Sequence, residues 1–178
     1  MKRVLIISTG PRKGGNSETL AEEFGKGSRD AGHQVEMIAL RDKAIGYCKG
    51  CLACQATGSC VIHDDANAVT QKMLHADVLV FATPIYFFEM CAQMKTLLDR
   101  TNPLFPTDYA FRDIYLVASA AEKEETSTDG AAKGLLGWIA CFGKTSLKGV
   151  IGACGVTDVG DIQGSPALRQ AYEMGRAV

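Results

Sequence analysis

The chain has 178 residues, of which 47% are hydrophobic and 22% are charged, and its formal net charge is −1 at pH 7. These values are those of an ordinary globular domain and exclude a disordered or fibrous protein. The length suits one compact domain over residues 1–178. Because the near-neutral charge gives no broad basic surface, we expect no nucleic-acid or membrane partner, and we favour small-molecule chemistry.

The N-terminal apolar run, from Val4 to Ile7, is too short for a signal peptide or a membrane span, so we expect a cytoplasmic protein. Seven cysteines in such a chain predict free thiols, metal ligands or redox groups, because the cytosol keeps ordinary thiols reduced. Their odd number also argues against a complete set of disulfides.

Short apolar or β-branched runs alternate along the chain with longer segments that suit helices. We expect strands at residues 4–8, 35–40, 78–82, 114–118 and 150–153. We expect helices at residues 17–31, 66–75, 90–100, 130–141 and 166–177, with Gly32 closing the first and Asp64 or Asp65 capping the second. This order predicts a doubly wound, five-stranded parallel sheet with helices on both faces and a ligand at the carboxyl ends of the strands.

The loop at residues 9–17 joins the first strand to the first helix and has the chemistry of a phosphate site. Its three glycines let the backbone curl closely around an anion, and the helix start supplies free N–H groups. A nucleoside triphosphatase is disfavoured, because Asn16 stands where a Walker loop needs its lysine, and the glycine pattern of a dinucleotide site is not met. A terminal monophosphate is the favoured ligand, and a well-capped tight turn is the structural alternative.

A cysteine-rich loop follows at residues 41–63. Its four cysteines lie within thirteen residues, at Cys48, Cys51, Cys54 and Cys60. Successive two-residue spacings suit a [4Fe–4S] cluster, since one short loop wraps around it, whereas structural zinc usually takes its ligands from two separated knuckles. A loop with no metal, in which the thiols are buried or oxidise as a pair, stays open as an alternative. We expect Cys91, Cys141 and Cys154 to lie in the core.

Residues 83–88 follow the third strand directly and place three aromatic side chains, Tyr86, Phe87 and Phe88, where the sheet ends. The rings and backbone of this segment suit a flat heterocycle such as a flavin. A flavin ring is apolar on its faces and polar along one edge, so it needs aromatic packing and nearby N–H donors. The alternative is that the same rings are buried for structural reasons.

These motifs resemble the NADPH-dependent FMN reductase family and, within it, the iron-sulfur flavoproteins. The resemblance rests on Ser8-x-x-Pro11-Arg12-Lys13-x-Gly15-Asn16-Ser17 and on residues 84–87, 93–95 and 99–100. It covers the chain up to Arg100, with a weaker match at residues 149–155. It implies an α/β flavodoxin-like fold with strand order 2-1-3-4-5 and FMN as the cofactor.

The resemblance also implies roles for individual residues. In that family the first loop holds the FMN phosphate, which carries over to Ser8, Arg12, Asn16 and Ser17. The second loop lies along the ribityl chain and ring, which carries over to Pro84, Ile85, Tyr86 and Phe87. A further flavin-contacting loop would begin at Ser119. The cysteine motif of the iron-sulfur flavoproteins matches Cys48, Cys51, Cys54 and Cys60 as ligands. For residues 93–100 we expect helix packing or a subunit contact, and we assign no catalytic residue.

The predicted function is an FMN-dependent oxidoreductase that moves electrons between NAD(P)H or ferredoxin and a small acceptor such as a quinone, a flavin or oxygen. A [4Fe–4S] cluster would let it divide hydride equivalents into single electrons. Two alternatives stay open, a flavodoxin-like electron carrier without enzymatic activity and a metal-stapled binding module with an empty nucleotide loop. The resemblance further implies a homodimer or homotetramer.

Overall fold

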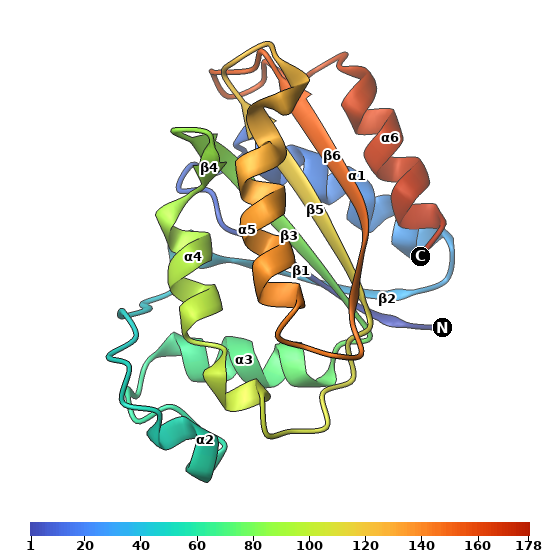
Figure 1. Ribbon diagram of the computed structural model, residues 1–178. Coiled ribbons are helices and arrows are strands. Elements are labelled where there is room, and N and C mark those ends of the chain that lie inside the picture. The colour runs from blue at the N-terminus through green and yellow to red at the C-terminus, as the bar shows by residue number, and fades with distance from the viewer.

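The computed structural model describes residues 1–178 and contains a central parallel sheet between two layers of helices (Figure 1). Five parallel strands run in the order β2-β1-β3-β5-β6. Their bounds are β1 Arg3–Ser8, β2 Gln34–Ala39, β3 Val78–Tyr86, β5 Asp113–Ala120 and β6 Ser146–Cys154. The predicted flavodoxin-like fold and the order of its parallel strands are therefore confirmed.

A sixth, antiparallel strand corrects the predicted count of five. β4, Glu89–Met90, pairs with the end of β3, so residues 83–88 are a strand end and a hairpin turn rather than a loop. Met90, the predicted first residue of a helix, lies in this strand instead. β3 continues through Pro84 because β1 stops at the level of Ala82, so the missing proline N–H falls where that neighbour has ended.

The helices divide between the two faces of the sheet (Figure 1). α1 (Asn16–Asp30) and α6 (Pro166–Arg176) cover one face, and α3 (Asp65–His75), α4 (Ala92–Asp99) and α5 (Asp129–Ile139) cover the other. Short 3-10 turns lie at Leu40–Asp42, Asn102–Leu104 and Glu125–Thr128. The small helix α2 (Ala53–Thr57) lies away from the sheet, in the cysteine loop. No helix combines the length and the apolar character needed to cross a lipid bilayer.

Both faces of the sheet are buried, which explains the unbroken apolar runs of the central strands. In β1, Leu5 and Ile7 point into the core under α3, α4 and α5, whereas Val4 and Ile6 point into the core under α1 and α6. The two cores hold the sheet between fixed layers, so the loops at its carboxyl edge start from rigid positions.

α1 and α6 approach each other closely through two glycines. Gly27 lies against the backbone carbonyl of Tyr172, and Gly175 lies against that of Phe24. A Cβ atom at either glycine would collide with backbone, which has no rotamer through which to move away. The layer formed by α1 and α6, in which α1 follows the first loop, is therefore held together by a contact that requires glycine.

Candidate functional site

The first loop and the ends of β3 and β5 meet in a narrow cleft at the carboxyl edge of the sheet. The cleft is lined by Gly10, Pro11, Arg12, Gly15, Asn16, Ser17, Pro84, Tyr86 and Ser119. The strand register explains the meeting, because Ser8 pairs with Ala82 and Pro84 pairs with Ser119. The predicted cofactor residues that line this cleft are Arg12, Asn16, Ser17, Pro84, Tyr86 and Ser119.

Three predicted cofactor residues lie outside the lining. Ser8 is fully buried at the end of β1, and its Oγ has no hydrogen-bond partner. Ile85 packs against the core beneath α4 and α5. Phe87 projects from the hairpin tip with its side chain completely exposed. A role for these three in holding a cofactor stays a prediction.

The start of α1 is arranged to receive an anion. Gly15, the N-cap residue, is extended, and no side chain caps the helix, so the N–H groups of the first turn are left for a ligand or solvent. Gly10 lies close to the Ser17 hydroxyl and to the ring of Pro84. A Cβ atom at Gly10 would be 3.3 Å from Ser17 Oγ and 3.4 Å from Pro84 Cδ, so a larger residue would crowd both. The cradle therefore offers backbone N–H groups and one hydroxyl.

An ion pair between the buried Glu18 and the partly buried Arg41 shapes the same loop. The Glu18 carboxylate accepts hydrogen bonds from the Gly14 N–H at 2.7 Å and from Arg41 Nη1 at 2.7 Å. The bond to Glu18 raises the pKa of Arg41 above its ordinary value. Because Arg41 neutralises Glu18, the carboxylate orders the loop with less repulsion toward an incoming phosphate.

The loop after β6 also supports the cradle, and the sequence analysis did not predict this contact. Asn16 Nδ2 donates to the Asp158 carbonyl at 2.9 Å, and Asn16 Oδ1 accepts from the Ile162 N–H at 3.4 Å. N–H groups of Thr157 and Asp158 lower the pKa of Asp161, which holds this loop in shape. The side chain of Asn16 is thus occupied within the chain, and its backbone N–H is the group placed for a ligand.

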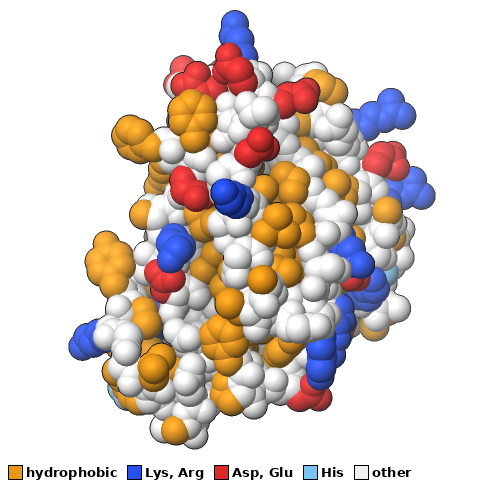
Figure 2. Space-filling view, in the orientation of Figure 1, with side chains coloured by type: hydrophobic (Ala, Val, Ile, Leu, Met, Phe, Trp, Pro, Cys, Tyr) orange, Lys and Arg blue, Asp and Glu red, His pale blue; other side chains and the backbone are white.

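The segment after β5 differs from the other two sides of the cleft. Ser119 lies within β5, and residues 121–126, which follow that strand, are exposed and carry Glu122, Glu124 and Glu125. Acidic side chains gather at the top of the molecule in Figure 2, over this segment. The segment that follows Ser119 therefore carries three carboxylates and one cation, Lys123.

The cysteine loop leaves the sheet after β2 and returns at α3 (Figure 1). Cys48 and Cys51 are exposed, Cys60 is partly exposed and Cys54 is buried, and all seven cysteines of the chain are free. Burial raises the pKa of the Cys54 thiol, and the other three thiols of the loop raise it further. The four thiols share one short loop, but no three of them are gathered in a metal-binding arrangement.

Arg100, just after α4, holds the two ends of the cysteine loop together. Nη1 donates to the Gly46 carbonyl and to Asp64 Oδ2, both at 2.7 Å, and Nη2 donates to Asp64 Oδ1 at 2.9 Å and to the Ile62 carbonyl at 3.2 Å. Burial would lower the pKa of Arg100, but contacts with Asp64 and the Cys60 thiol raise it above its ordinary value. For this segment the sequence had predicted helix packing or a subunit contact.

The start of α3 completes the closure of the cysteine loop. We give the name neck to the five residues that form this closure, which are Gly46, Ile62, Asp64, Asp65 and Arg100. Asp64 is the predicted N-cap, because it accepts from the Ala66 N–H at 3.0 Å, and it also accepts from the Gly46 N–H at 2.8 Å. Burial disfavours its charged form, but hydrogen bonds, led by that from Arg100, lower the pKa of Asp64 below its ordinary range. Asp65 accepts from the Ala44 N–H at 2.7 Å.

The three cysteines outside the loop differ in their burial. Cys91 is buried as predicted and lies 3.2 Å from the Thr9 hydroxyl, and Cys154 is partly buried at the end of β6. The prediction that Cys141 lies in the core is wrong. α5 ends at Ile139, so Cys141 falls in the exposed turn that follows the helix.

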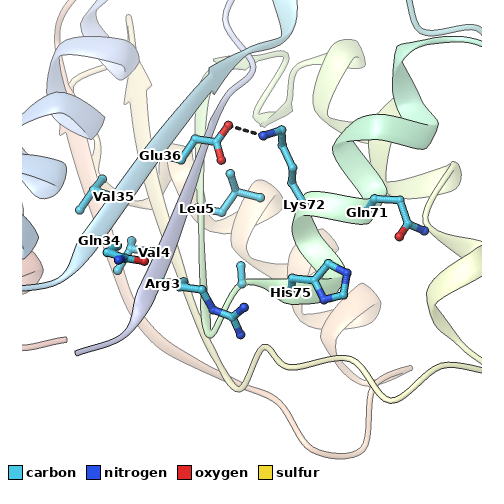
Figure 3. A pocket seen from close by; sticks show the side chains of 10 residues that line it. Arg3, Val4, Leu5, Gln34, Val35, Glu36, Gln71, Lys72 and His75 are labelled. Carbon is cyan, nitrogen blue, oxygen red and sulfur yellow. Dashed lines mark hydrogen bonds and ion pairs between the residues drawn. The ribbon is translucent and has the colours of Figure 1, made fainter.

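A larger cavity, of about 410 Å³, lies elsewhere, between α3 and the first two strands (Figure 3). The strand residues that line it belong to the amino-terminal parts of β1 and β2, whereas the phosphate cradle lies at the carboxyl ends of the strands. Its cations already have partners, since Lys72 Nζ lies 2.6 Å from Glu36 Oε1 and Arg3 pairs with Asp77. The cleft near Gly10 has a volume of only about 10 Å³, but it lies at the start of α1, where no side chain caps the backbone N–H groups.

Comparison with known proteins agrees with this geometry. The family model described as NADPH-dependent FMN reductase matches residues 2–127. The chain belongs to the NADPH-dependent FMN reductase family. This confirms the predicted resemblance and the predicted class, a family of oxidoreductases that work with FMN.

Relatives of this FMN reductase family member include several iron-sulfur flavoproteins. One from Methanocaldococcus jannaschii is 38% identical over 102 residues, which is 57% of this chain and 53% of that protein. One from Archaeoglobus fulgidus is 37% identical over 103 residues, 58% of this chain and 46% of that protein. The putative NAD(P)H-dependent FMN-containing oxidoreductase YwqN of Bacillus subtilis is 33% identical over 109 residues, 58% of this chain and 57% of that protein. The matches span about half the length of these curated relatives.

Solved structures show the same fold over the whole chain. An NAD(P)H:quinone oxidoreductase from Methanothermobacter marburgensis superposes with a TM-score of 0.76 at 21% identity and covers 98% of both chains. The azoreductase AzrA gives a TM-score of 0.74 at 16% identity and covers 99% of this chain and 100% of its own.

Proposed function

We propose that the protein is an FMN-dependent oxidoreductase that takes electrons from NAD(P)H or ferredoxin and passes them to a small acceptor such as a quinone, a free flavin or oxygen. The observation that carries this proposal is the cradle between Gly10, Gly15 and Ser17. It offers donors without partners at the carboxyl edge of a flavodoxin-like sheet, where such folds bind their ligands. Family membership and the name of YwqN support the choice of FMN and NAD(P)H.

The residues of the cleft fit FMN. The first-turn N–H groups of α1 and the Ser17 hydroxyl would hold its phosphate, and the exposed cations Arg12 and Lys13 would balance the phosphate charge. Tyr86, which lines the cleft from the end of β3, would lie along the ribityl chain and ring. FMN would supply the capacity to accept a hydride and to release electrons one at a time.

We further propose that Cys48, Cys51, Cys54 and Cys60 hold a [4Fe–4S] cluster. Four thiols on one loop are the donor set that such clusters require, and two of them are exposed on a loop that lies away from the sheet. The names of the relatives from Methanocaldococcus jannaschii and Archaeoglobus fulgidus support this choice over zinc. The cluster would supply one-electron transfer. A homodimer or homotetramer and a cytoplasmic location stay predictions.

Anaerobic purification with added FMN tests the proposal directly. We expect an absorbance spectrum with flavin and iron-sulfur bands, about one FMN per chain as one cradle predicts, and rapid bleaching of the flavin when NADPH is mixed in a stopped-flow instrument. Flavin that binds but is reduced only by a protein donor would favour the electron-carrier alternative. A protein that neither binds nor retains FMN would overturn the proposal.

A further inference from the structure

Arg100 is an unusual residue for a short surface helix, because its side chain is completely shielded from solvent. It follows α4 and points into the neck rather than outward. A guanidinium has five N–H donors, and the four on Nη1 and Nη2 are all used, on the Gly46 and Ile62 carbonyls and on Asp64. These bonds account for its role in closing the loop.

The fifth donor is not accounted for. Arg100 Nε is buried and has no hydrogen-bond partner. Buried donors in folded proteins nearly always have an acceptor, so a donor without one points to a group that the free chain does not present in the bonding position. Arg100 Nη2 bonds to the carbonyl of Ile62, which lies only two residues after Cys60, one of the four proposed cluster ligands. The Cys60 thiol also helps to raise the pKa of Arg100, so it belongs to the surroundings of this guanidinium.

We propose that Arg100 is a positioning residue for the metal-binding loop, in which Nε–H donates a hydrogen bond to the sulfur of Cys60 when that sulfur is a metal-bound thiolate. This inference rests on the proposed cluster function of the same loop. A thiol is a weak acceptor, whereas a thiolate is a strong one, so the donor gains its partner only when the ligand is formed.

The arrangement gives Arg100 two consequences for a bound cluster. It fixes the orientation of one ligand from a guanidinium that is itself held rigidly by Asp64 and two carbonyls, as partners of metal ligands commonly do. It also directs a hydrogen bond at a ligand sulfur, and such bonds raise the reduction potential of iron-sulfur clusters because they stabilise the more negative, reduced state.

If Arg100 served only to close the neck, its role would be purely structural, and its variants should behave like other variants that weaken the neck. Asp65 also closes the neck, through the Ala44 N–H, but no bond of its side chain reaches a cysteine. Asp65→Asn therefore weakens the neck while leaving Arg100 Nε–H in place, which makes it the matched control. Lys95→Gln, on the exposed face of α4, is a second control, which changes the same helix and leaves the neck intact.

The test compares wild type, Arg100→Lys, Asp65→Asn and Lys95→Gln, each reconstituted anaerobically with iron and sulfide. We expect Arg100→Lys to lose iron to a competing chelator about 10- to 100-fold more readily and to show a more negative cluster midpoint potential, with neither change in the two controls. Equal shifts in Arg100→Lys and Asp65→Asn, or no shift in either, would overturn the inference and leave the cluster proposal intact. A wild-type protein that binds FMN but no iron would instead overturn the cluster proposal, and this inference with it.

A measurement on the wild-type protein keeps the inference testable if Arg100→Lys does not fold. Protein labelled with ¹⁵N only in arginine is reduced, and electron spin echo spectroscopy of the cluster is recorded. We expect modulation from one arginine ¹⁵N nucleus, because the Nε–H···S bond transmits electron spin to that nitrogen. A spectrum without arginine coupling would rule out the bond.

Discussion

The guanidinium of Arg100 and the carboxylate of Asp64 face each other through two parallel hydrogen bonds, of 2.7 Å from Nη1 to Oδ2 and 2.9 Å from Nη2 to Oδ1. This fork-to-fork geometry is the strongest form of an arginine–carboxylate pair. Because the pair joins the end of α4 to the start of α3 across the neck, its loss should be felt in the stability of the whole domain.

Removal of one partner should be strongly destabilising, because it leaves the buried charge of the other without compensation. We expect Asp64→Ala to lower the free energy of unfolding by about 3–5 kcal/mol. The matched control is Lys95→Ala, which breaks the exposed Lys95–Asp99 pair on the same helix and should change stability by less than about 0.5 kcal/mol. Urea unfolding of both variants gives the comparison, and similar values for the two would contradict this account.

The stability of the protein should also depend on pH through the same carboxylate. The pKa of Asp64 is lowered in the folded protein, so folding is favoured while Asp64 is ionised. The stabilisation is fully present above the unfolded pKa, about 3.9, and is lost as pH falls through the lower folded pKa. The pKa of Asp77, beside Arg3, is lowered too and acts in the same direction. Urea unfolding between pH 7 and 3 should show a decline below about pH 4 that is shallower in Asp64→Asn.

The Ser17 hydroxyl should contribute to FMN affinity. A hydrogen bond to a charged group contributes about 1.5–3 kcal/mol, so we expect Ser17→Ala to raise the dissociation constant of FMN by about 10- to 100-fold. Ser28, at the other end of α1, donates to the Gly175 carbonyl and is distant from the cleft. Ser28→Ala should reduce stability and leave the FMN titration unchanged. Equal FMN affinities for Ser17→Ala and wild type would remove Ser17 from the cradle.

Glycines in helices should respond to alanine in opposite ways. Gly27→Ala forces α1 away from the Tyr172 carbonyl and should destabilise the protein by about 1–3 kcal/mol. At Gly137, in α5, an added Cβ atom would have no neighbour within 4 Å, so Gly137→Ala should stabilise by about 0.4–1 kcal/mol through helix propensity and reduced chain entropy. Thermal unfolding that shifts both variants in the same direction would contradict this assignment.

The hairpin turn carries backbone strain. Phe87 and Phe88 have φ values of +52° and +63°, where hairpins ordinarily use asparagine and glycine. A residue with a Cβ atom is disfavoured there by about 1–2 kcal/mol, so Phe88→Gly should be more stable than Phe88→Ala, although both remove the same exposed ring. The pair of variants therefore separates strain from side-chain loss, and equal melting temperatures would show that the turn is unstrained.

The fold could be predicted from the sequence because both faces of its parallel sheet are buried. The apolar runs of β1 and β3 and the glycine-rich loop between β1 and α1 report directly on that burial and on the start of a helix. β4 could not be predicted, since it has only two residues and its turn lacks the usual turn residues. Periodicity carries no information on so short a pairing.

Only those parts of the candidate site that have a local sequence pattern could be predicted. The first loop could be singled out because a helix start has a local pattern, but the support from Asp158 and Ile162 depends on contacts between distant parts of the chain. Arg100 was missed for the same reason. A cation at the end of a helix usually lies in solvent, and only the folded chain brings it to Asp64. The Asp64-Asp65 pair after the cysteines was the available clue that a buried cation was needed.

The neck gives the cysteine loop a degree of evolutionary independence. The bonds of the neck involve residues at or outside the loop's two ends, and within the loop Cys60 is hydrogen-bonded to Asn67 of α3, so most of the segment between Tyr47 and Cys60 can change in length, in spacing or in its number of thiols while the sheet and both helix layers are kept. Descendants of one ancestral scaffold could thus acquire or discard a metal centre without having to evolve a new domain.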